Sequence, residues 1–274
     1  MTNLLIVGCG HMGEAILVSL IKSKKYKITV IDPKRYYFLN KKYKNKSLNI
    51  IKSIDKLKKN IKFNFVLLAV KPIDIDNVLK ELLLLNLGSK VVLVSIIAGK
   101  KIQVFQKKLT KIKNIFRIMP NIPALIGHSM NCIVSSKSSS NKSKQDVDKL
   151  FSYCGKNVFL KNENEIDMST AISGSGPGFV FNLIDAMEKA AINLGFKENI
   201  AKILVSQTFE GSINLIQKSN NSASELVNMV ATKGGTTEAG LNIMKKNKLH
   251  KIFINLTKAS YKKAKDQGNK NAKR

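Results

Sequence analysis

Cysteine and histidine are scarce in this sequence, with three residues of each type among 274. They are Cys9, Cys132 and Cys154, and His11, His128 and His250. An odd number of widely separated cysteines, with no CxxC pair, argues against a disulfide framework and a structural zinc site. The histidines have no metal-ligand spacing either, so we expect no metal.

Long hydrophobic runs are also missing. The longest, such as Phe65–Val70, are much shorter than the roughly 20 residues that a membrane-spanning helix needs. The N-terminal segment MTNLLIVGCG has no basic residue before its apolar stretch and no cleavage-site pattern, which argues against a secretory signal. We therefore expect a soluble cytoplasmic protein with no membrane partner.

Acidic residues and arginine are few, whereas lysine is abundant. The formal net charge is +29, yet only three of the 47 basic residues are arginine. Proteins that read nucleic acid depend strongly on arginine and concentrate their charge on one face, whereas these lysines are spread along the whole chain. Lysine, asparagine and isoleucine all have A- and T-rich codons, so a biased genome explains the composition, and we expect no nucleic-acid partner. The charge should still attract anionic ligands over long range.

The order of apolar segments predicts two domains. Up to residue 160, short apolar runs alternate with helical patterns, which is typical of a parallel sheet covered by helices on both faces. From residue 161 to 274 the pattern becomes helical throughout. The predicted strands are 3–7, 27–31, 65–70, 91–95, 114–119 and 130–134, and the helices after residue 161 are 178–194, 200–217, 223–230, 238–245 and 248–265.

The second domain is too apolar to stand alone in water. One of its helices has apolar residues on several faces, namely Ile200, Ile203, Leu204, Phe209, Ile213 and Leu215. We therefore expect a homodimer formed through the C-terminal helices, with a higher oligomer as an extension of it.

A GxGxxG motif follows the first predicted strand and begins a helix. Gly8 allows a tight turn, Gly10 lets a pyrophosphate approach the backbone, and Gly13 allows close packing of helix and strand. An acidic residue, Asp32, stands at the end of the next strand, as such sites require. This context favours a dinucleotide-binding, Rossmann-like domain over a merely structural turn.

The residues after the second strand give conflicting indications about the dinucleotide. Asp32 would bond a ribose 2′-hydroxyl and favour NAD. Pro33 follows it, and then come Lys34 and Arg35, which could neutralise a 2′-phosphate and favour NADP. An ordinary solvated helix start explains the two cations equally well.

Three further motifs stand where open α/β sheets bind ligands, at the ends of strands. They are AVKP at 69–72, SIIAG at 95–99 and RIMPNIP at 117–123. Lys71 could lie near a cofactor or simply be exposed. Asn121 lies between two prolines, and a rigid loop of this kind could hold its side-chain amide in a fixed hydrogen-bonding direction. A purely structural turn is the alternative.

Two glycine-rich segments carry hydroxyl groups and precede helices in the second domain. They are SGSGP at 173–177 and KGGTT at 233–237. Such loops present backbone N–H groups and a helix dipole to an anion, and a carboxylate is the natural ligand. Taken singly, each could also be no more than a helix cap.

Together these motifs resemble pyrroline-5-carboxylate reductases, the enzymes of the last step of proline biosynthesis. The matching segments, in the family's order, are IVGCGHMGEAI at 6–16, LLAVKP at 67–72, SIIAG at 95–99, RIMPNIPALIG at 117–127, AISGSGPGFVF at 171–181 and VATKGGTTEAGL at 230–241.

The resemblance implies reduction of 1-pyrroline-5-carboxylate to L-proline, with NADPH as cofactor and NADH as an alternative hydride donor. It implies a dinucleotide domain (1–160) followed by a helical dimerisation domain (161–274). It places cofactor contacts on Gly8, Cys9, Gly10, His11, Met12, Gly13, Asp32, Pro33, Ala69, Val70, Lys71, Pro72, Ile97 and Ala98. To these we add Lys34, Arg35 and Asn121.

Substrate contacts implied by the resemblance lie on Thr232 and on the backbone of Gly234, Gly235, Thr236 and Thr237, and we add Ser175. The Thr237 hydroxyl would face the ring nitrogen and is the predicted catalytic group. The chain departs from the family pattern in three places: Thr232-Lys233 replaces Ser-Pro, Gly178 replaces alanine, and Ile122 replaces threonine.

Two other functions are weighed against this one. A β-hydroxyacid-type dehydrogenase should carry a lysine in a GxxGxGxxxK-like pattern, and the segment from Gly174 to Lys189 lacks that spacing. A non-enzymatic, basic dinucleotide- or nucleic-acid-binding protein would require both C-terminal glycine-rich loops to be helix caps only.

Overall fold

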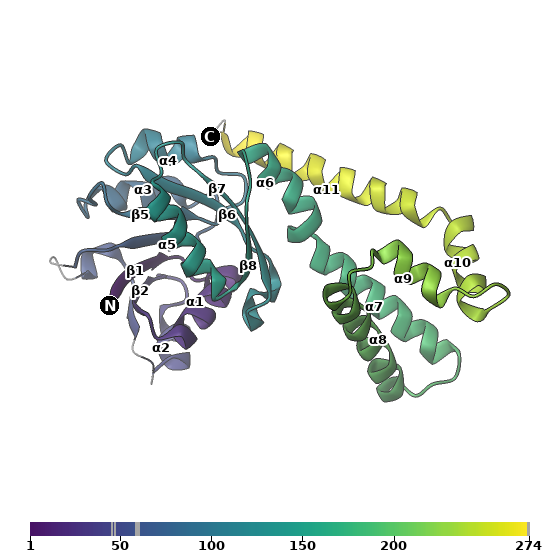
Figure 1. Cartoon of the computed structure of the whole chain (residues 1–274). Helices are drawn as coiled ribbons and strands as arrows, with labels where there is room; N and C mark the ends of the chain where they lie inside the picture. Colours follow the sequence, from purple (N-terminus) through teal and green to yellow (C-terminus); the bar gives the residue numbers. More distant parts are fainter. Residues whose placement is uncertain (45, 47, 58–60, 273–274) are drawn as a thin grey trace. The chain divides into compact units, whose positions relative to one another are not determined.

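The computed structural model describes residues 1–44, 46, 48–57 and 61–272. The chain divides into two compact units (Figure 1). The first contains Met1–Ser175 together with the end of the chain from Ser260, and the second contains Gly176–Ala259.

In the described part of the chain, eight strands form one sheet in the order β3-β2-β1-β4-β5-β6-β7-β8. They are β1 (Thr2–Val7), β2 (Tyr26–Ile31), β3 (Leu48–Ile51), β4 (Phe65–Leu68), β5 (Val92–Ser95), β6 (Asn114–Met119), β7 (Ser129–Ser135) and β8 (Gly155–Phe159). The expected parallel sheet is confirmed with one exception, because β7 runs antiparallel to β6. Only residues 120–128 join these two strands, including a 3₁₀ turn at Ile122–Ile126, and a parallel crossover needs a dozen residues or more.

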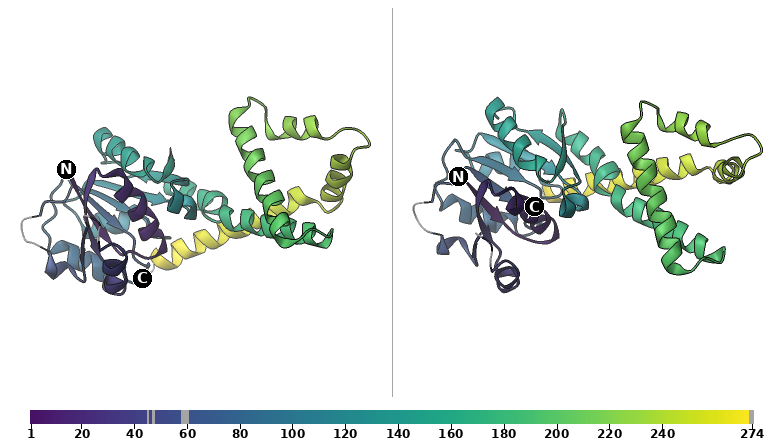
Figure 2. Two further views of the ribbon diagram at one scale, coloured as in Figure 1. Left: turned by 90° about the horizontal axis from the view of Figure 1, so that it is seen from below. Right: turned by 60° about the horizontal axis from the view of Figure 1, so that its bottom comes forward.

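Helices cover both faces of this sheet (Figure 2). The helices α1 (His11–Ser23), α2 (Tyr36–Lys42) and α5 (Asn141–Ser152) pack on the face that includes Leu4 and Ile6. The helices α3 (Ile75–Leu83), α4 (Ile102–Lys108) and α6 (Glu163–Ser169) pack on the face that includes Leu5 and Val7. Because successive side chains of a strand point to opposite faces, the apolar run of β1 supplies both cores.

Side-chain caps mark where several helices begin. The Ser140 hydroxyl accepts the backbone N–H of Ser143 at the start of α5, and the Asn162 side chain accepts two N–H groups of α6. In the second unit, Ser222 and Glu225 form a reciprocal capping box at α9. Such caps satisfy N–H groups that have no partner within the helix.

The second unit is helical, as expected. Its elements are α7 (Gly176–Asn193), α8 (Glu198–Lys218), α9 (Ala223–Val230), α10 (Thr236–Lys246) and the first part of α11 (Leu249–Ala272). No described helix combines the length and apolar character needed to cross a membrane.

The first unit extends to Ser175, beyond the boundary predicted at residue 160. A buried ion cluster accounts for this extension. Arg117 on β6, with a side chain 3% exposed, pairs with Glu163 at 3.2 Å and with Asp167 at 2.8 Å, both on α6. Glu163 also accepts the backbone N–H of Ile102 at 3.0 Å. The ion cluster therefore fixes α6 to the sheet, although its sequence pattern belongs with the helical half.

Replacing Arg117 with methionine should destabilise the protein strongly, because Glu163 and Asp167 would lose their buried counter-charge. Removing one partner of a buried ion pair costs about 3–5 kcal/mol. Urea unfolding at pH 7 and one fixed protein concentration measures this loss. The control is Arg117→Met combined with Glu163→Gln and Asp167→Asn, which removes the uncompensated charges and should recover part of the stability. A loss below about 1 kcal/mol in Arg117→Met, the ordinary scale of an exposed pair, would contradict the assignment.

Candidate functional site

The carboxyl ends of β1, β4 and β5 lie at one level of the sheet. Val7 pairs with Leu68, and Leu68 pairs with Ser95. The chain leaves β1 towards β2 and β3 but leaves β4 towards β5 and β6, so the strand order reverses between β1 and β4. Open α/β sheets bind ligands at such a switch point. The glycine motif and the segments 69–72 and 96–99 therefore share one edge.

The three glycines of the motif have different surroundings. Gly8 has φ +85°, and a Cβ atom there would lie 2.8 Å from the carbonyl carbon and oxygen of Ala69. A Cβ atom at Gly13 would lie 2.8 Å from the Gly8 carbonyl oxygen, whereas a Cβ atom at Gly10 would meet nothing within 4 Å. Gly8 and Gly13 therefore serve chain packing, and the open space is at Gly10, the N-cap residue of α1. This space and the N–H groups of the first helical turn suit a phosphate group.

Asp32 joins the glycine loop to the loop after β2. It is 8% exposed, and its carboxylate accepts the backbone N–H groups of Cys9 at 2.7 Å, Lys34 at 3.0 Å and Arg35 at 2.9 Å. A carboxylate has about four acceptor positions, so most of those on Asp32 are already used. The contact of Asp32 with a ribose remains a prediction. Its structural role, which is to hold the glycine loop and the loop after β2 together, was missed by sequence reasoning.

Lys34 and Arg35 differ in their freedom. The Lys34 side chain is 76% exposed and has a loose contact of 3.6 Å with Asp74. Arg35 donates to the Cys9 carbonyl oxygen and, at 2.7 Å, to Glu14. Of these two cations, Lys34 is therefore the one that can move towards a ligand.

The other predicted cofactor residues lie along the same loops with different exposure. His11, Pro33, Lys71 and Ala98 are exposed; Met12, Ala69, Val70 and Pro72 are partly buried; Cys9 and Ile97 are buried. Burial raises the pKa of the Cys9 thiol to about 12, so Cys9 stays protonated. Ile97 packs in the core on the α3 face, which leaves only its backbone for a ligand.

Asn121 is 8% exposed, and its side-chain amide is bonded inside the protein. The amide nitrogen donates to the Ser173 carbonyl oxygen at 2.9 Å, and the amide oxygen accepts the Met130 N–H at 2.9 Å. Asn121 thereby connects the end of β6, the start of β7 and the segment at Ser173. These bonds agree with the alternative that Asn121 stabilises a turn. A contact between Asn121 and a cofactor remains a prediction.

One turn of π-helix, Thr170–Gly174, leads into the SGSGP motif and includes its first two residues. The Ser175 N–H donates to the Thr170 carbonyl oxygen at 2.8 Å, and Ser175 is partly buried. Single π-helical turns are frequent at functional sites. This turn supports Ser175 as a candidate without assigning its ligand.

In the second unit, the KGGTT loop is held by its own bonds. Gly234 has φ +76°, and its N–H donates to the Glu238 carboxylate at 2.7 Å. The Gly235 N–H donates to the Thr232 carbonyl oxygen at 2.9 Å, and a Cβ atom at Gly235 would lie 2.6 Å from the Thr232 hydroxyl oxygen. The N–H groups of both glycines are therefore engaged inside the loop.

Thr237 is not the N-cap residue of the helix that follows the KGGTT loop. The helix α10 begins at Thr236, and its N-cap is Gly235, which has no side chain to cap it. Thr237 is thus the second helical residue, and its side chain is exposed. The N–H groups of Thr236 and Thr237 belong to the first turn, where the helix offers no partner. They are the donors that suit a carboxylate in this loop.

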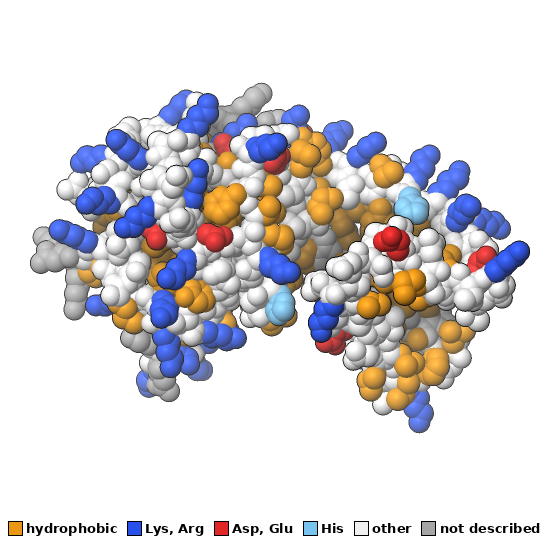
Figure 3. All heavy atoms as spheres, in the orientation of Figure 1, with side chains coloured by type: hydrophobic (Ala, Val, Ile, Leu, Met, Phe, Trp, Pro, Cys, Tyr) orange, Lys and Arg blue, Asp and Glu red, His pale blue; other side chains and the backbone are white. Residues whose placement is uncertain are grey.

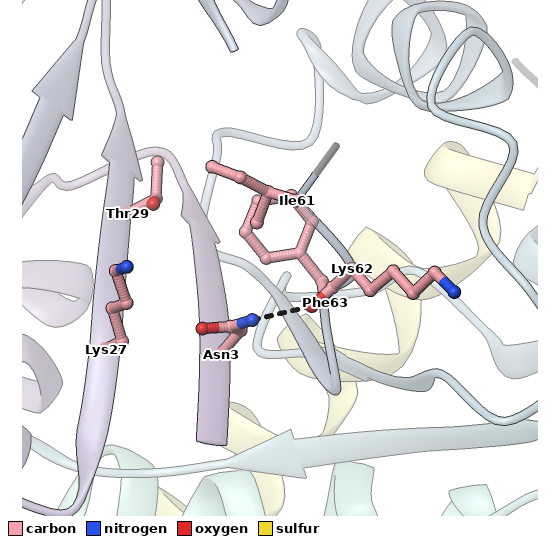
Figure 4. A pocket seen from close by; sticks show the side chains of 6 residues that line it. All are labelled: Asn3, Lys27, Thr29, Ile61, Lys62 and Phe63. Atoms are coloured by element: carbon pink, nitrogen blue, oxygen red, sulfur yellow. Dashed lines mark hydrogen bonds between the residues drawn. The ribbon is translucent and has the colours of Figure 1, made fainter. Parts of the chain in front are cut away.

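A separate cavity of about 220 Å³ lies near the amino ends of β1 and β2, away from this edge (Figure 4). It is lined by Asn3, Lys27, Thr29, Ile61, Lys62 and Phe63. Among the described residues, His, Cys, Asp and Glu do not gather in groups of three that could hold a metal ion.

Comparison with known proteins now identifies the family. Residues 163–267 match the model for pyrroline-5-carboxylate reductase dimerisation, and residues 3–99 match the model for NADP oxidoreductase, coenzyme F420-dependent. The pyrroline-5-carboxylate reductase of Haemophilus influenzae is 33% identical over 86% of this chain and 87% of that protein. The enzyme of that name from Synechocystis is 32% identical over 97% of this chain and 98% of that protein. The chain belongs to the pyrroline-5-carboxylate reductase family.

Solved structures of pyrroline-5-carboxylate reductases have the same fold. The Plasmodium falciparum enzyme, with NADP bound, superposes with a TM-score of 0.85 at 28% identity over 97% of this chain and 98% of that one. The Coxiella burnetii enzyme superposes with a TM-score of 0.86 at 26% identity over the same shares of the two chains. Membership of the pyrroline-5-carboxylate reductase family decides against the β-hydroxyacid-type and the non-enzymatic alternatives.

Alanine substitutions at Gly8 and Gly10 should differ in how much they lower the free energy of unfolding, because only Gly8 is packed against backbone. Gly8→Ala places a methyl group against the backbone of Ala69 and in a left-handed conformation, so it should cost about 2–4 kcal/mol. Gly10→Ala changes only an open N-cap and should cost less than about 1 kcal/mol. Urea unfolding of the two variants measures the difference, and equal losses would contradict the described packing.

Proposed function

We propose that this chain reduces 1-pyrroline-5-carboxylate to L-proline, with NADPH as hydride donor and NADH as an alternative. The observation that carries the proposal is the match to pyrroline-5-carboxylate reductases along nearly the whole chain, combined with a glycine loop at the switch point of the sheet. When bound, the nicotinamide supplies the hydride.

The residues at the sheet edge fit a dinucleotide. The open space at Gly10 and the first turn of α1 suit its pyrophosphate, and the exposed cation of Lys34 suits a 2′-phosphate. Asp32 is bonded to three backbone N–H groups, which offset the negative charge that would otherwise disfavour NADPH. The NADP in the Plasmodium falciparum relative supports the same cofactor here.

For the substrate, the proposal assigns the carboxylate to the N–H groups of Thr236 and Thr237. Gly234 and Gly235 give the loop its shape through their internal bonds. The Thr237 hydroxyl is assigned to the ring nitrogen, where it orients the imine. A protonated imine accepts hydride readily, so the protein needs chiefly to position the two reactants.

Removing the Thr237 hydroxyl should reduce turnover without much loss of stability. Thr237→Ala should lower kcat/KM for 1-pyrroline-5-carboxylate by roughly 10- to 100-fold, equivalent to about 1–3 kcal/mol for a lost hydrogen bond. Thr237→Ser keeps the hydroxyl and should retain most of the activity. Steady-state kinetics with NADPH and with NADH measure these effects. Wild-type protein that does not turn over this substrate would contradict the function, and unchanged kcat/KM in Thr237→Ala would contradict the role of Thr237.

The C-terminal helices are proposed to form a homodimer, in agreement with the match to a dimerisation model. Many large apolar side chains of the second unit are exposed (Figure 3). They include Phe181, Leu194, Ile203, Ile213, Leu215, Met229, Val230 and Ile243. Helices that are apolar on several faces need a partner to bury them, and a second copy of the same helices supplies one.

The dimer should persist at micromolar concentration, because an obligate apolar interface buries more than roughly 2,000 Å². Light scattering coupled to size-exclusion chromatography should give at least twice the 30.4 kDa of one chain. Placing a charge at Ile213, as in Ile213→Asp, should shift the protein towards monomer. A wild-type monomer at this concentration would contradict the proposal.

A further inference from the structure

A buried carboxylate, which none of the predicted functions uses, follows the glycine loop directly. The Glu14 side chain on α1 is only 10% exposed. One oxygen accepts hydrogen bonds from the Lys42 ammonium at 2.7 Å and the Tyr43 hydroxyl at 2.9 Å. The other oxygen accepts from Arg35 at 2.7 Å. Burial raises the pKa of Glu14, but the bonds from Lys42, Arg35 and Tyr43 outweigh that effect and lower it. Glu14 is therefore a charged group with several specific partners.

Arg35 is held from several sides by this arrangement. One terminal nitrogen donates to Glu14, and the other donates to the carbonyl oxygen of Cys9 in the glycine loop. The guanidinium carbon lies over the ring of Phe38, 4.7 Å from its centroid. The side chain nevertheless remains 28% exposed. Both terminal nitrogens are thus held by a bond, and Phe38 covers one face of the guanidinium, so a flat ligand would stack on the opposite face.

Flat guanidinium groups stack well on aromatic rings. Arg35 is bonded to the glycine loop itself and follows Asp32 on the loop after β2, where a dinucleotide of this fold places its adenosine. In a dinucleotide bound in this way, the adenine ring would be the aromatic group next to Arg35.

Lys34 stands in contrast to its neighbour. Its contact with Asp74 is long and exposed on both sides, so the ammonium group can leave it without loss of a buried bond. A lysine ammonium is a mobile point charge, suited to a phosphate whose position is set by other contacts.

We propose that Glu14 is a positioning residue for cofactor recognition, which fixes Arg35 as the stacking surface for the adenine ring and leaves Lys34 to bind the 2′-phosphate. The inference rests on the proposed NADPH-dependent function. It assigns different tasks to the two adjacent cations.

Two nucleotides that differ only in the 2′-phosphate test this division. Calorimetric titration of the full-length protein with adenosine 5′-monophosphate and adenosine 2′,5′-bisphosphate gives a dissociation constant for each. Lys34→Ala should weaken binding of the bisphosphate by about tenfold, the scale of one charge-assisted hydrogen bond, and leave the monophosphate unchanged. Arg35→Lys and Glu14→Gln should each weaken binding of the monophosphate by roughly three- to tenfold, on the scale of a stacking contact.

The route through Arg35 is tested by the double variant. If Glu14 acts by holding Arg35, Glu14→Gln combined with Arg35→Lys should bind the monophosphate no more weakly than Arg35→Lys alone. Lys41→Ala, which removes one exposed charge from the same helix α2, controls for the general loss of positive charge and should change neither constant. Where Glu14→Gln does not fold, Phe38→Leu takes its place, because it removes the aromatic ring that supports the guanidinium from one face.

Two results would overturn the inference. The first is unchanged binding of the monophosphate in Glu14→Gln and in Phe38→Leu. The second is an Arg35→Lys variant that loses affinity for the bisphosphate alone, which would make Arg35 the phosphate ligand. Because these titrations contain no pyrroline substrate, they are independent of turnover. A wild-type protein with the expected binding pattern but no activity would contradict the proposed function and not this inference.

Discussion

The parallel pairing of β1 with β4 is the interaction on which the rest of the site depends. It brings Val7 opposite Leu68 and is continued by the bond from the Ala69 N–H to the Val7 carbonyl oxygen at 2.8 Å. The loops after these strands meet so closely that Gly8 admits no side chain. Because the strand order reverses at this pair, the edge next to it is left open for a ligand. The glycine motif therefore forms a binding loop only because β1 pairs with β4, a strand some sixty residues later in the chain.

The sequence predicted the interior of the sheet better than its edges. The runs that became β1, β2, β4, β5 and β6 are nearly continuous apolar segments, as buried parallel strands are. The strands β3 and β8 lie at the two edges, and the sequence of β8, GKNVF, is mostly polar or partly exposed. Edge strands are defined by the neighbour with which they pair, so their own sequences carry a weak signal. The ion cluster of Arg117 likewise joins segments whose local patterns belong to different domains.

At the site, the residue types in the sequence indicated which positions are candidates for ligand binding, but they did not indicate what each side chain contacts. Asp32 is used largely by backbone N–H groups, and Asn121 bonds a carbonyl oxygen 52 residues away. Glu14 was missed because it stands within an apolar helix, and its partners are 21 to 29 residues further on. An acidic residue on an otherwise buried helix face is the signal that could have found it, since such a charge needs nearby cations.

Helix α11 begins in the second unit and returns to the first at Ser260, where the Tyr261 hydroxyl donates to Asn164 of α6 at 2.9 Å. In topological terms, the helical unit is an insertion between two pieces of the dinucleotide unit. The lysine-rich end of the chain looks like a dispensable tail, but it is the closing piece of the unit in which the chain starts. A truncation that removes Tyr261 would therefore take away a contact of the nucleotide-binding unit before it reaches the part of α11 that belongs to the second unit.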